Sequence, residues 1–252
     1  MAVDREELVA SLNQYLDLDA VEDASLNGLQ LEGASRIEHL AVAVDAAQAT
    51  IEGAIDAGCQ FLLVHHGLFW GTPAPLAGPL ASRVRACFAA EMSVYAAHLP
   101  LDRHPEVGNN VLLAKALGGS VTGEFGRVGG VALGALAQLD EPCEIGALAG
   151  RLAAAGCREP LLWSFGPPAI ERLAVVTGAG CSLLEEAVAM AADCFVTGEP
   201  RHSAFHIARE RHIHCLFGGH YATETFGVRA LGAWLGQRYD LEVNWIDHPT
   251  GV

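Results

Sequence analysis

Two stretches of the chain repeat the same alternation of apolar and amphipathic segments. An apolar run begins at Ile37, an amphipathic stretch follows, and a second short apolar run ends at Val64. The same order occurs between Ile170 and Thr197. Residues 37–67 align with residues 170–200 without a gap. Each copy therefore predicts a strand, a helix and a second strand.

The similarity resumes after a change in length. Residues 86–98 match residues 208–220 as a helix followed by a strand, so that His98 aligns with His220 and Asp102 with Glu224. Self-similarity at a fixed offset is typical of repeated structural units. Because strands alternate with helices, we predict an α/β fold of two similar, interlocked lobes from an internal duplication. Their sheets are expected to be mostly parallel, flanked by helices and joined by right-handed crossovers.

The expected lobes cover residues 1–124 and 125–252. Glycine pairs at 118–119 and 129–130 mark the predicted joint between them. A helix at about 221–236 and a strand at 241–246 could pack back on either lobe. At the other end of the chain, Asp4 is expected to cap the first helix, with Glu7 three residues further on.

Charge and hydropathy limit the partners and the compartment. The chain has 15 Lys and Arg residues against 30 Asp and Glu, a formal net charge of −15. Nucleic acid and anionic membranes are therefore not expected as main partners, because either would need a basic surface. A nucleotide is still allowed, since divalent ions could supply local positive charge. The N-terminal residues do not resemble a signal peptide and no apolar run reaches membrane-spanning length, so we expect a cytoplasmic protein.

The seven cysteines are scattered and include no C-x-x-C pair. Cys59, Cys87, Cys194 and Cys215 lie in apolar runs, where a small buried side chain is the expected role. A disulfide framework is not expected, which suits a reducing compartment.

Two His-x-x-x-carboxylate pairs each follow a short apolar strand. The second pair, His220 and Glu224, has the i, i+4 spacing that places both side chains on one face of a helix. In the first pair, Leu99-Pro100 separates His98 from Asp102, so these residues are expected on a turn. Asp102 could alternatively cap a helix predicted at 107–117.

A further histidine pair, His65-His66, directly follows the strand that ends at Val64. Adjacent residues of a strand point to opposite faces, which makes it hard for both to bind one ion. At the carboxyl end of a parallel strand, where α/β sheets build their sites, the two imidazoles could instead diverge toward two neighbouring ions. The alternative is a histidine pair that only closes the sheet edge.

Glu199 aligns with His66 in the repeat and could be a ligand, an orienting group or a general base. Arg201, His202 and His206 follow, and could either bind an anionic substrate or form a solvated helix face. Nitrogen and carboxylate donors without thiolate favour Mn, Fe, Zn, Co or Mg. Two such ions sharing a carboxylate, about 3.5–4 Å apart, would activate a bridging water. The chain has no P-loop and no Rossmann glycine fingerprint, so a triphosphate would have to be held by metal, Arg and His contacts.

Several segments closely resemble the NIF-three/YbgI-like family, whose members are known as GTP cyclohydrolase 1 type 2 homologues. The matching segments span residues 25–33, 64–70, 97–102, 108–110, 197–199 and 218–224. The chain has the short form, without the domain that some members carry between the lobes. Many members have His-His-Pro where this chain has His65-His66-Gly67.

The resemblance implies a dinuclear metal site in the cleft between the two lobes and a ring-shaped homohexamer. It also implies a set of ligands in which Glu224 bridges the two ions. Carried over by motif position, these ligands are His65, His66, Asp102, His220 and Glu224. His98 then becomes a site-lining residue, although the repeat alone would make it a ligand equal to His220. We follow the motif for the ligands and assign catalytic roles to Glu224, His98 and Glu199.

The function implied by the resemblance is metal-dependent hydrolysis of a nucleotide or related heterocycle. In this hypothesis a metal-activated water attacks C8 of the GTP purine, opens the imidazole ring and leads to release of formate. One alternative is a non-enzymatic protein that handles metal or serves as a scaffold. Another is a di-metal oxidase or phosphoesterase. The expected partners are thus a small-molecule substrate, two divalent ions and further copies of the chain.

Overall fold

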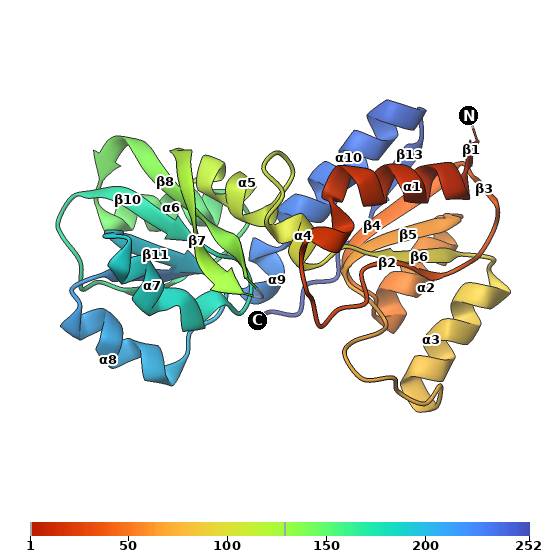
Figure 1. The fold of residues 1–252 in the computed structure, drawn as a ribbon, viewed down its shortest axis with the longest axis horizontal. Helices are drawn as coiled ribbons and strands as arrows, with labels where there is room; N and C mark the ends of the chain where they lie inside the picture. Colours follow the sequence, from red (N-terminus) through yellow and green to blue (C-terminus); the bar gives the residue numbers. More distant parts are fainter. Residues whose placement is uncertain (1, 129) are drawn as a thin grey trace. The chain divides into compact units, whose positions relative to one another are not determined.

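The computed structural model describes residues 2–128 and 130–252, which fold as two compact units (Figure 1). Unit 1 comprises the residues up to Leu101 together with Gly227–His248. Unit 2 comprises Asp102–Phe226 and Pro249–Val252. This division differs from the expected boundary at residue 124, because the segment after Asp102 packs within unit 2 and the C-terminal segment returns to unit 1.

Unit 1 is built on a five-stranded sheet with the order β13-β4-β5-β6-β2. Its strands are β13 (Glu242–Trp245), β4 (His39–Asp45), β5 (Phe61–His66), β6 (Ser93–Ala96) and β2 (Gly28–Leu31). The first four run parallel to one another, and β2 is antiparallel to β6. The mostly parallel sheet predicted from the apolar runs is confirmed in this unit. The strand expected at 241–246 is β13, at the edge of the sheet.

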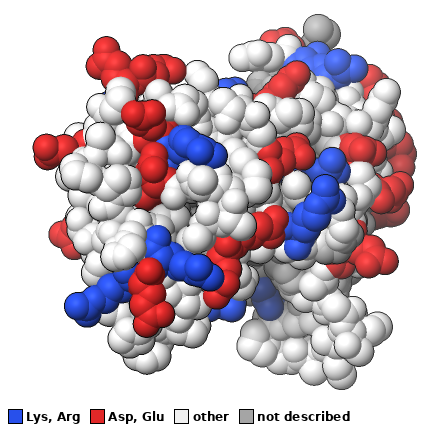
Figure 2. Space-filling model, turned by 60° about the vertical axis from the view of Figure 1, so that its left-hand side comes forward, with Lys and Arg blue, Asp and Glu red and all other residues white. Residues whose placement is uncertain are grey.

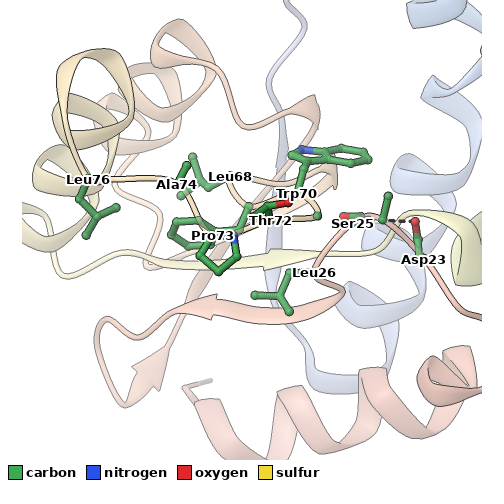
Figure 3. A pocket seen from close by; sticks show the side chains of 12 residues that line it. Asp23, Ser25, Leu26, Leu68, Trp70, Thr72, Pro73, Ala74 and Leu76 are labelled. Carbon is green, nitrogen blue, oxygen red and sulfur yellow. Dashed lines mark hydrogen bonds between the residues drawn. The ribbon is translucent and has the colours of Figure 1, made fainter.

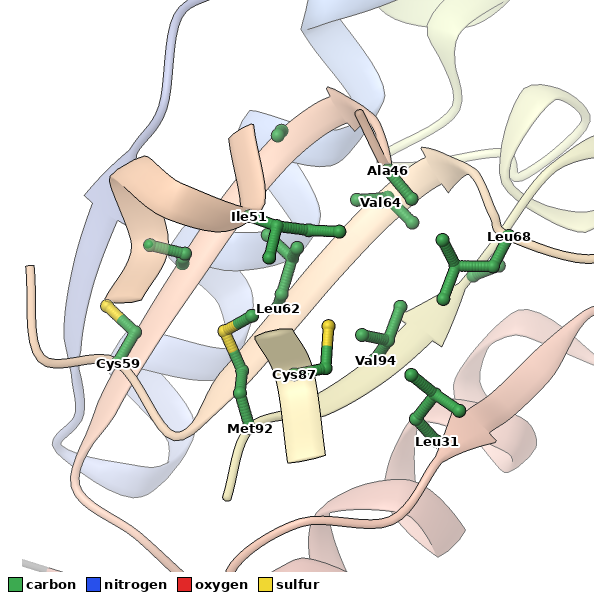
Figure 4. Packing of buried hydrophobic residues seen from close by; sticks show 14 of the residues in the cluster. Leu31, Ala46, Ile51, Cys59, Leu62, Val64, Leu68, Cys87, Met92 and Val94 are labelled. Carbon is green, nitrogen blue, oxygen red and sulfur yellow. The ribbon is translucent and has the colours of Figure 1, made fainter. Parts of the chain in front are cut away.

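One face of this sheet is covered by α2 (Gln48–Asp56) and α3 (Gly78–Ala89). Ile51 of α2 and Cys87 of α3 are fully buried against the apolar side chains of β5 and β6 (Figure 4). These strands are nearly continuous apolar runs in the sequence, because helices cover both faces of the sheet and shield the strands from solvent. The rest of the cluster includes Leu31, Ala46, Cys59, Leu62, Val64, Leu68, Met92 and Val94.

The opposite face is covered by α1 (Arg5–Leu16) and α10 (Thr225–Tyr239). The two helices touch through Tyr15 and Trp234, whose rings stack with centroids 4.0 Å apart. Asp4 caps α1, as predicted, by accepting hydrogen bonds from the next backbone N–H groups of the first turn. Two short strands, β1 (Val3–Asp4) and β3 (Arg36–Ile37), pair antiparallel beside it, and η1 (Leu18–Ala20) follows α1.

Unit 2 contains a second set of three parallel strands. They are β10 (Ile170–Val175), β11 (Cys194–Thr197) and β12 (His214–Phe217), adjacent in that order. The helices α7 (Leu184–Ala189) and α8 (His202–Glu210) connect them, and η2 (Gly180–Leu183) precedes α7. The order strand-helix-strand-helix-strand is the same as β4-α2-β5-α3-β6 of unit 1.

The remaining pairings in this sheet are antiparallel, so the prediction of a mostly parallel sheet is wrong for unit 2. β7 (Gly119–Val128) pairs with β8 (Val131–Cys143), β8 with β10, and β9 (Leu161–Trp163) with β12. The turn between β7 and β8 is too short for the long crossover that parallel neighbours require. Gly118 and Gly119 therefore lie inside unit 2, and Gly130 lies in the hairpin turn with φ +87°. Gly129 lies outside the described residues.

Helices cover both faces of the sheet in unit 2. On one face, α5 (Asn109–Ala116) and α6 (Ile145–Ala154) enclose a cluster that includes Leu113, Leu148 and Leu173. On the other face, α7 and α8 enclose a second cluster whose largest members are phenylalanines. These are Phe125, Phe195 and Phe217.

The seven cysteines are free thiols, and the four predicted to be buried are buried. Burial raises the pKa of Cys59 to about 11 and that of Cys215 to about 12, since a thiolate is poorly solvated in an apolar core. These thiols therefore act as small apolar side chains rather than as ligands or nucleophiles.

The charge imbalance is visible at the surface. On the face drawn in Figure 2, the larger groups of Lys and Arg side chains lie beside Asp and Glu. That face offers no extended basic surface of the kind that binds a nucleic-acid backbone. Within the described residues, no helix is both long enough and apolar enough to cross a membrane.

Candidate metal centre

Three imidazoles meet at the carboxyl edge of the sheet in unit 1. His65 and His66 end β5, and His98 follows β6. One nitrogen of each ring lies within 4.8 Å of the corresponding nitrogens of the other two. The ring centroids of His65 and His66 are 4.8 Å apart, and those of His65 and His98 are 5.0 Å apart. Because β5 and β6 are parallel neighbours, their carboxyl ends bring all three rings to one edge.

Each of these rings has its Nδ1 held by an oxygen that can only accept a hydrogen bond. The oxygens are the carbonyl of Ala97 for His65 (2.8 Å), the carboxylate of Asp45 for His66 (2.8 Å) and the carboxylate of Asp23 for His98 (2.9 Å). Nδ1 therefore carries the proton in each ring, and the lone pair of the neutral imidazole lies on Nε2. Metal-binding histidines are usually oriented in this way.

Asp23 is a buried carboxylate that ties a loop to the imidazole group. Burial works against its charged form, but hydrogen bonds and charge from His98, the side chain of Asn27 and the backbone N–H of Ser25 outweigh burial. Together they hold the pKa of Asp23 well below its ordinary value. The carboxylate also accepts a hydrogen bond from the backbone N–H of Leu99 (3.0 Å). The charge of Asp23 is thus fixed beside His98.

Unit 2 presents an imidazole and carboxylates in a similar arrangement. His220 begins the one-turn helix α9 (His220–Thr223), and its Nε2 lies 3.1 Å from Oε2 of the buried Glu224. Nδ1 of His220 is 2.5 Å from the carboxylate of Glu199. The hydrogen bond with Glu224 raises the pKa of His220 to about 9 against the effect of burial, with Glu199 adding to the rise. At neutral pH a cation at Nε2 would therefore have to displace a proton.

The helix predicted at 221–236 is two helices. α9 ends at Thr223, Glu224 lies at the break, and α10 begins at Thr225. The hydroxyl of Thr223 bonds to the carbonyls of Gly219 and His220, and it also accepts a hydrogen bond from the N–H of Gly178. These contacts hold the single turn in place, so that His220 and Glu224 meet although no continuous helix joins them.

The loop after β10 packs directly against Glu224. Gly178 has φ +62°, and its carbonyl accepts hydrogen bonds from the N–H groups of Gly198 and Glu199, both at 3.0 Å. A Cβ atom on Gly178 would overlap Oε1 of Glu224. The loops after β10, β11 and β12 thus converge at the carboxyl edge of this sheet as well.

Gly178→Ala is expected to lower the free energy of unfolding by about 3 kcal/mol, because left-handed backbone strain adds to overlap with Glu224. Urea unfolding followed by circular dichroism measures this change. Gly58→Ala is the matched control, since Gly58 has φ +69° and open space at its Cβ position. It should lose only about 1–2 kcal/mol from backbone strain. If both variants lost the same free energy of unfolding, overlap with Glu224 would add nothing to the cost of backbone strain.

Asp102 belongs to unit 2 and ends the one-turn helix α4 (Leu99–Asp102), whereas a turn was predicted. Pro100 is compatible with this helix because the first turn needs no donor from its backbone nitrogen. The buried carboxylate of Asp102 accepts hydrogen bonds from Asn109 (2.8 Å) and from the hydroxyl of Thr177 (3.4 Å). The N-cap of α5 is Gly108, so capping is not the role of Asp102. Through Thr177 it lies on the same loop edge as Gly178 and Glu224.

A family model described as Duf34/NIF3 (NGG1p interacting factor 3) matches residues 3–250. The chain belongs to the Duf34/NIF3 family. The prediction made from the sequence motifs is therefore confirmed, and the match covers both units.

Relatives of this NIF3-family protein match it over nearly their whole length. A Deinococcus radiodurans protein named "GTP cyclohydrolase 1 type 2 homolog" is 40% identical over 250 residues, covering 99% of this chain and 95% of that protein. An Escherichia coli K12 protein of the same name is 38% identical over 247 residues, covering 97% and 98%. Among solved structures, protein ybgI, described as of unknown function, has a TM-score of 0.93 at 37% identity, covering 99% and 100%. A structure from Thermus thermophilus has a TM-score of 0.89 at 42% identity, also covering 99% and 100%.

Sequence reasoning missed the carboxylates that orient the histidines of this NIF3-family protein. Asp45 ends β4 at the same sheet edge as His66, so the strand-end rule applied to the histidines could have found it. Asp23 lies 75 residues from His98 in the chain, and no local pattern connects the two. Among the three roles left open for Glu199, its hydrogen bond to His220 supports the orienting one. Arg201, His202 and His206 are exposed, which fits the solvated helix face.

The donor atoms of this NIF3-family protein fit divalent metal ions. Unit 1 offers three imidazoles oriented through Nδ1, and unit 2 offers one imidazole with two buried carboxylates. Such nitrogen and oxygen donors suit Mn, Fe, Zn or Co. The described groups could therefore bind metal, and no thiolate takes part.

Proposed function

We propose that this NIF3-family protein, built from two duplicated lobes, binds two divalent metal ions with ligands from both of its units. The proposed ligands are His65, His66, Asp102, His220 and Glu224, with Glu224 bridging. One observation carries the proposal: an oxygen holds Nδ1 of each of the three clustered imidazoles and of His220, which fixes the direction in which each Nε2 points. A structural histidine needs no such repeated arrangement at the carboxyl ends of parallel strands.

The proposed reaction is hydrolysis of a nucleotide or a related heterocycle. Bound as a pair, the ions would supply a water of lowered pKa and positive charge for a developing oxyanion. Asp45 and Glu199 keep the rings of His66 and His220 in fixed orientations. His98 can accept a proton at Nε2, because Asp23 on its Nδ1 stabilises the resulting imidazolium. Glu224 contributes a buried carboxylate, and the role of Glu199 is to orient His220.

The names of the relatives favour a purine nucleotide as substrate. On GTP, one water would add at C8 and open the imidazole ring, and a second would release formate. A non-enzymatic role in metal handling is the competing function, and the experiment below distinguishes the two. We also propose a cytoplasmic homohexameric ring, which light scattering would detect at six times the chain mass of 26.5 kDa.

The test is turnover by protein loaded separately with Mn, Fe(II), Zn or Co. The loaded protein is incubated with GTP, other nucleoside triphosphates and nucleosides, and formate is measured. We expect formate release from GTP that requires metal and falls at least about 100-fold in His98→Ala, as for loss of a general acid-base group. His202→Ala, which removes an exposed histidine, should match the unmodified protein. Fully loaded protein that converts none of the panel would overturn the hydrolase and favour metal handling.

A further inference from the structure

Residues 23–26, 68–74 and 76 line a pocket of about 460 Å³ (Figure 3), which adjoins His66 and His98 of unit 1. Trp70 belongs to both, since it lines the pocket and its ring centroid lies 4.9 Å from that of His98 and 5.7 Å from that of His66. Asp23 likewise lines the pocket and binds His98. A molecule in this pocket would therefore lie beside the candidate metal ligands.

The pocket walls are fixed by backbone pairing between two segments, residues 23–26 and 68–76. Ser25 and Trp70 form an antiparallel bridge, and the N–H of Leu26 donates to the carbonyl of Phe69 (3.1 Å). The indole N–H of Trp70 donates to the carbonyl of Gly67 (3.0 Å). Because its only donor is already used, Trp70 offers the pocket an aromatic surface rather than a hydrogen bond.

The lining has an apolar end and a polar end. In Figure 3, Leu76 and Ala74 lie at one end, and Asp23 and Ser25 lie at the other. Leu26 and Leu76 are 58% and 60% exposed, which is costly for large apolar side chains unless a ligand covers them. Ser25 is buried, and its hydroxyl oxygen has no hydrogen-bond partner among the described residues. A buried hydroxyl in that state is expected to bind a polar atom of a ligand.

The charge of the lining does not attract phosphate. The described residues that line the pocket include no Lys or Arg, and Asp23 contributes a negative charge. An anionic group would be repelled here, whereas an uncharged ring fits the apolar surface and the volume. Aromatic stacking on Trp70 would add affinity for a planar ring.

We infer that this pocket binds the uncharged planar heterocycle of the substrate, stacked on Trp70 and hydrogen-bonded to Ser25, with any phosphate outside. The inference deepens the proposed function and rests on it, because it assigns the ring-binding part of that same site.

The test measures equilibrium binding of guanosine to the full chain by calorimetry, both as purified and after chelation of metal. Ribose 5-phosphate and tripolyphosphate are titrated in parallel. We expect guanosine to bind in both preparations and the two phosphates not to bind the chelated protein. Leu26→Arg should weaken guanosine binding by at least about tenfold through loss of apolar contact, and Ser25→Ala by roughly fivefold through loss of one hydrogen bond. Leu161→Arg changes another exposed leucine, outside the pocket, and should have no effect.

Three outcomes would overturn the inference. The first is an absence of guanosine binding at millimolar concentration in both preparations. The second is unchanged affinity in both Leu26→Arg and Ser25→Ala with the fold intact by circular dichroism. The third is a change of oligomer mass in Leu26→Arg while guanosine still binds normally, which would identify the pocket as a contact between copies. Guanosine binding without any turnover would instead count against the hydrolase alone, since the binding measurement does not require activity.

Discussion

Glu224→Ala is expected to reduce the metal content of reconstituted protein from two ions per chain to one or fewer. Glu224 is buried, lies 3.1 Å from Nε2 of His220, and is the proposed bridging ligand. Loss of an orienting neighbour alone typically costs 10–100-fold in metal affinity, so loss of a bridging ligand should cost at least about 100-fold. Mass spectrometric metal analysis after dialysis against micromolar metal gives the stoichiometry.

The same measurement on His65→Ala tests whether the two units share their ions. His65 belongs to unit 1 and Glu224 to unit 2. If both sets of ligands hold one pair of ions, either variant should weaken the binding of the whole pair. If each unit held its own ion, each variant would lose one ion and retain the other with unchanged affinity. That result would contradict the shared site.

Two exposed residues provide matched controls for these variants. Glu52→Ala removes a carboxylate from the surface of α2, and His202→Ala removes an imidazole from the start of α8. Neither should change the metal content, because neither side chain lies at the carboxyl edge of a parallel strand. Full metal content in Glu224→Ala would show that Glu224 is not a metal ligand.

The sequence predicts the fold well where the pattern of apolar residues along the chain matches the burial of those residues in the structure. The apolar runs at 37–42 and 61–64 become β4 and β5, since a strand covered on both faces needs apolar residues at successive positions. The histidines of the candidate site could be predicted from the same strands. His65, His98 and His220 each come just after or at the end of such a strand, and within each sheet the carboxyl ends of the parallel strands lie at the same edge.

The sequence failed where contacts between distant segments decide the structure. Gly118-Gly119 has the composition of a linker, yet Gly119 begins β7, and the pairing of β7 with β8 places both glycines inside unit 2. The break at Glu224 depends on the contact between Thr223 and Gly178, which are 45 residues apart. The carboxylate partners of the histidines depend on loop folding in the same way. Local periodicity contains no information about such pairs.

Asn110→Ala is expected to be the most destabilising of the substitutions considered, lowering the free energy of unfolding by about 4 kcal/mol. Asn110 is buried, and its side-chain amide nitrogen donates to the backbone carbonyls of Leu133 (2.7 Å) and Asp102 (3.2 Å). Its side-chain oxygen accepts a hydrogen bond from the backbone N–H of Thr177 (2.7 Å). Alanine would leave all three backbone groups without this partner, at about 1–3 kcal/mol each before relaxation. For a chain of this size, the melting temperature should fall by roughly 10 °C.

Thermal unfolding followed by circular dichroism measures this loss, with Asn13→Ala as the control. Asn13 is exposed on α1 and accepts one hydrogen bond, from the hydroxyl of Tyr95. Its replacement should cost about 1–2 kcal/mol, because the buried hydroxyl of Tyr95 loses its acceptor while alanine favours the helix. Asn110 also fixes the backbone on either side of the candidate site, at Asp102 and Thr177, so the folded fraction of Asn110→Ala should bind metal more weakly. If it melted like Asn13→Ala and bound metal normally, the three hydrogen bonds would not be what holds these segments together.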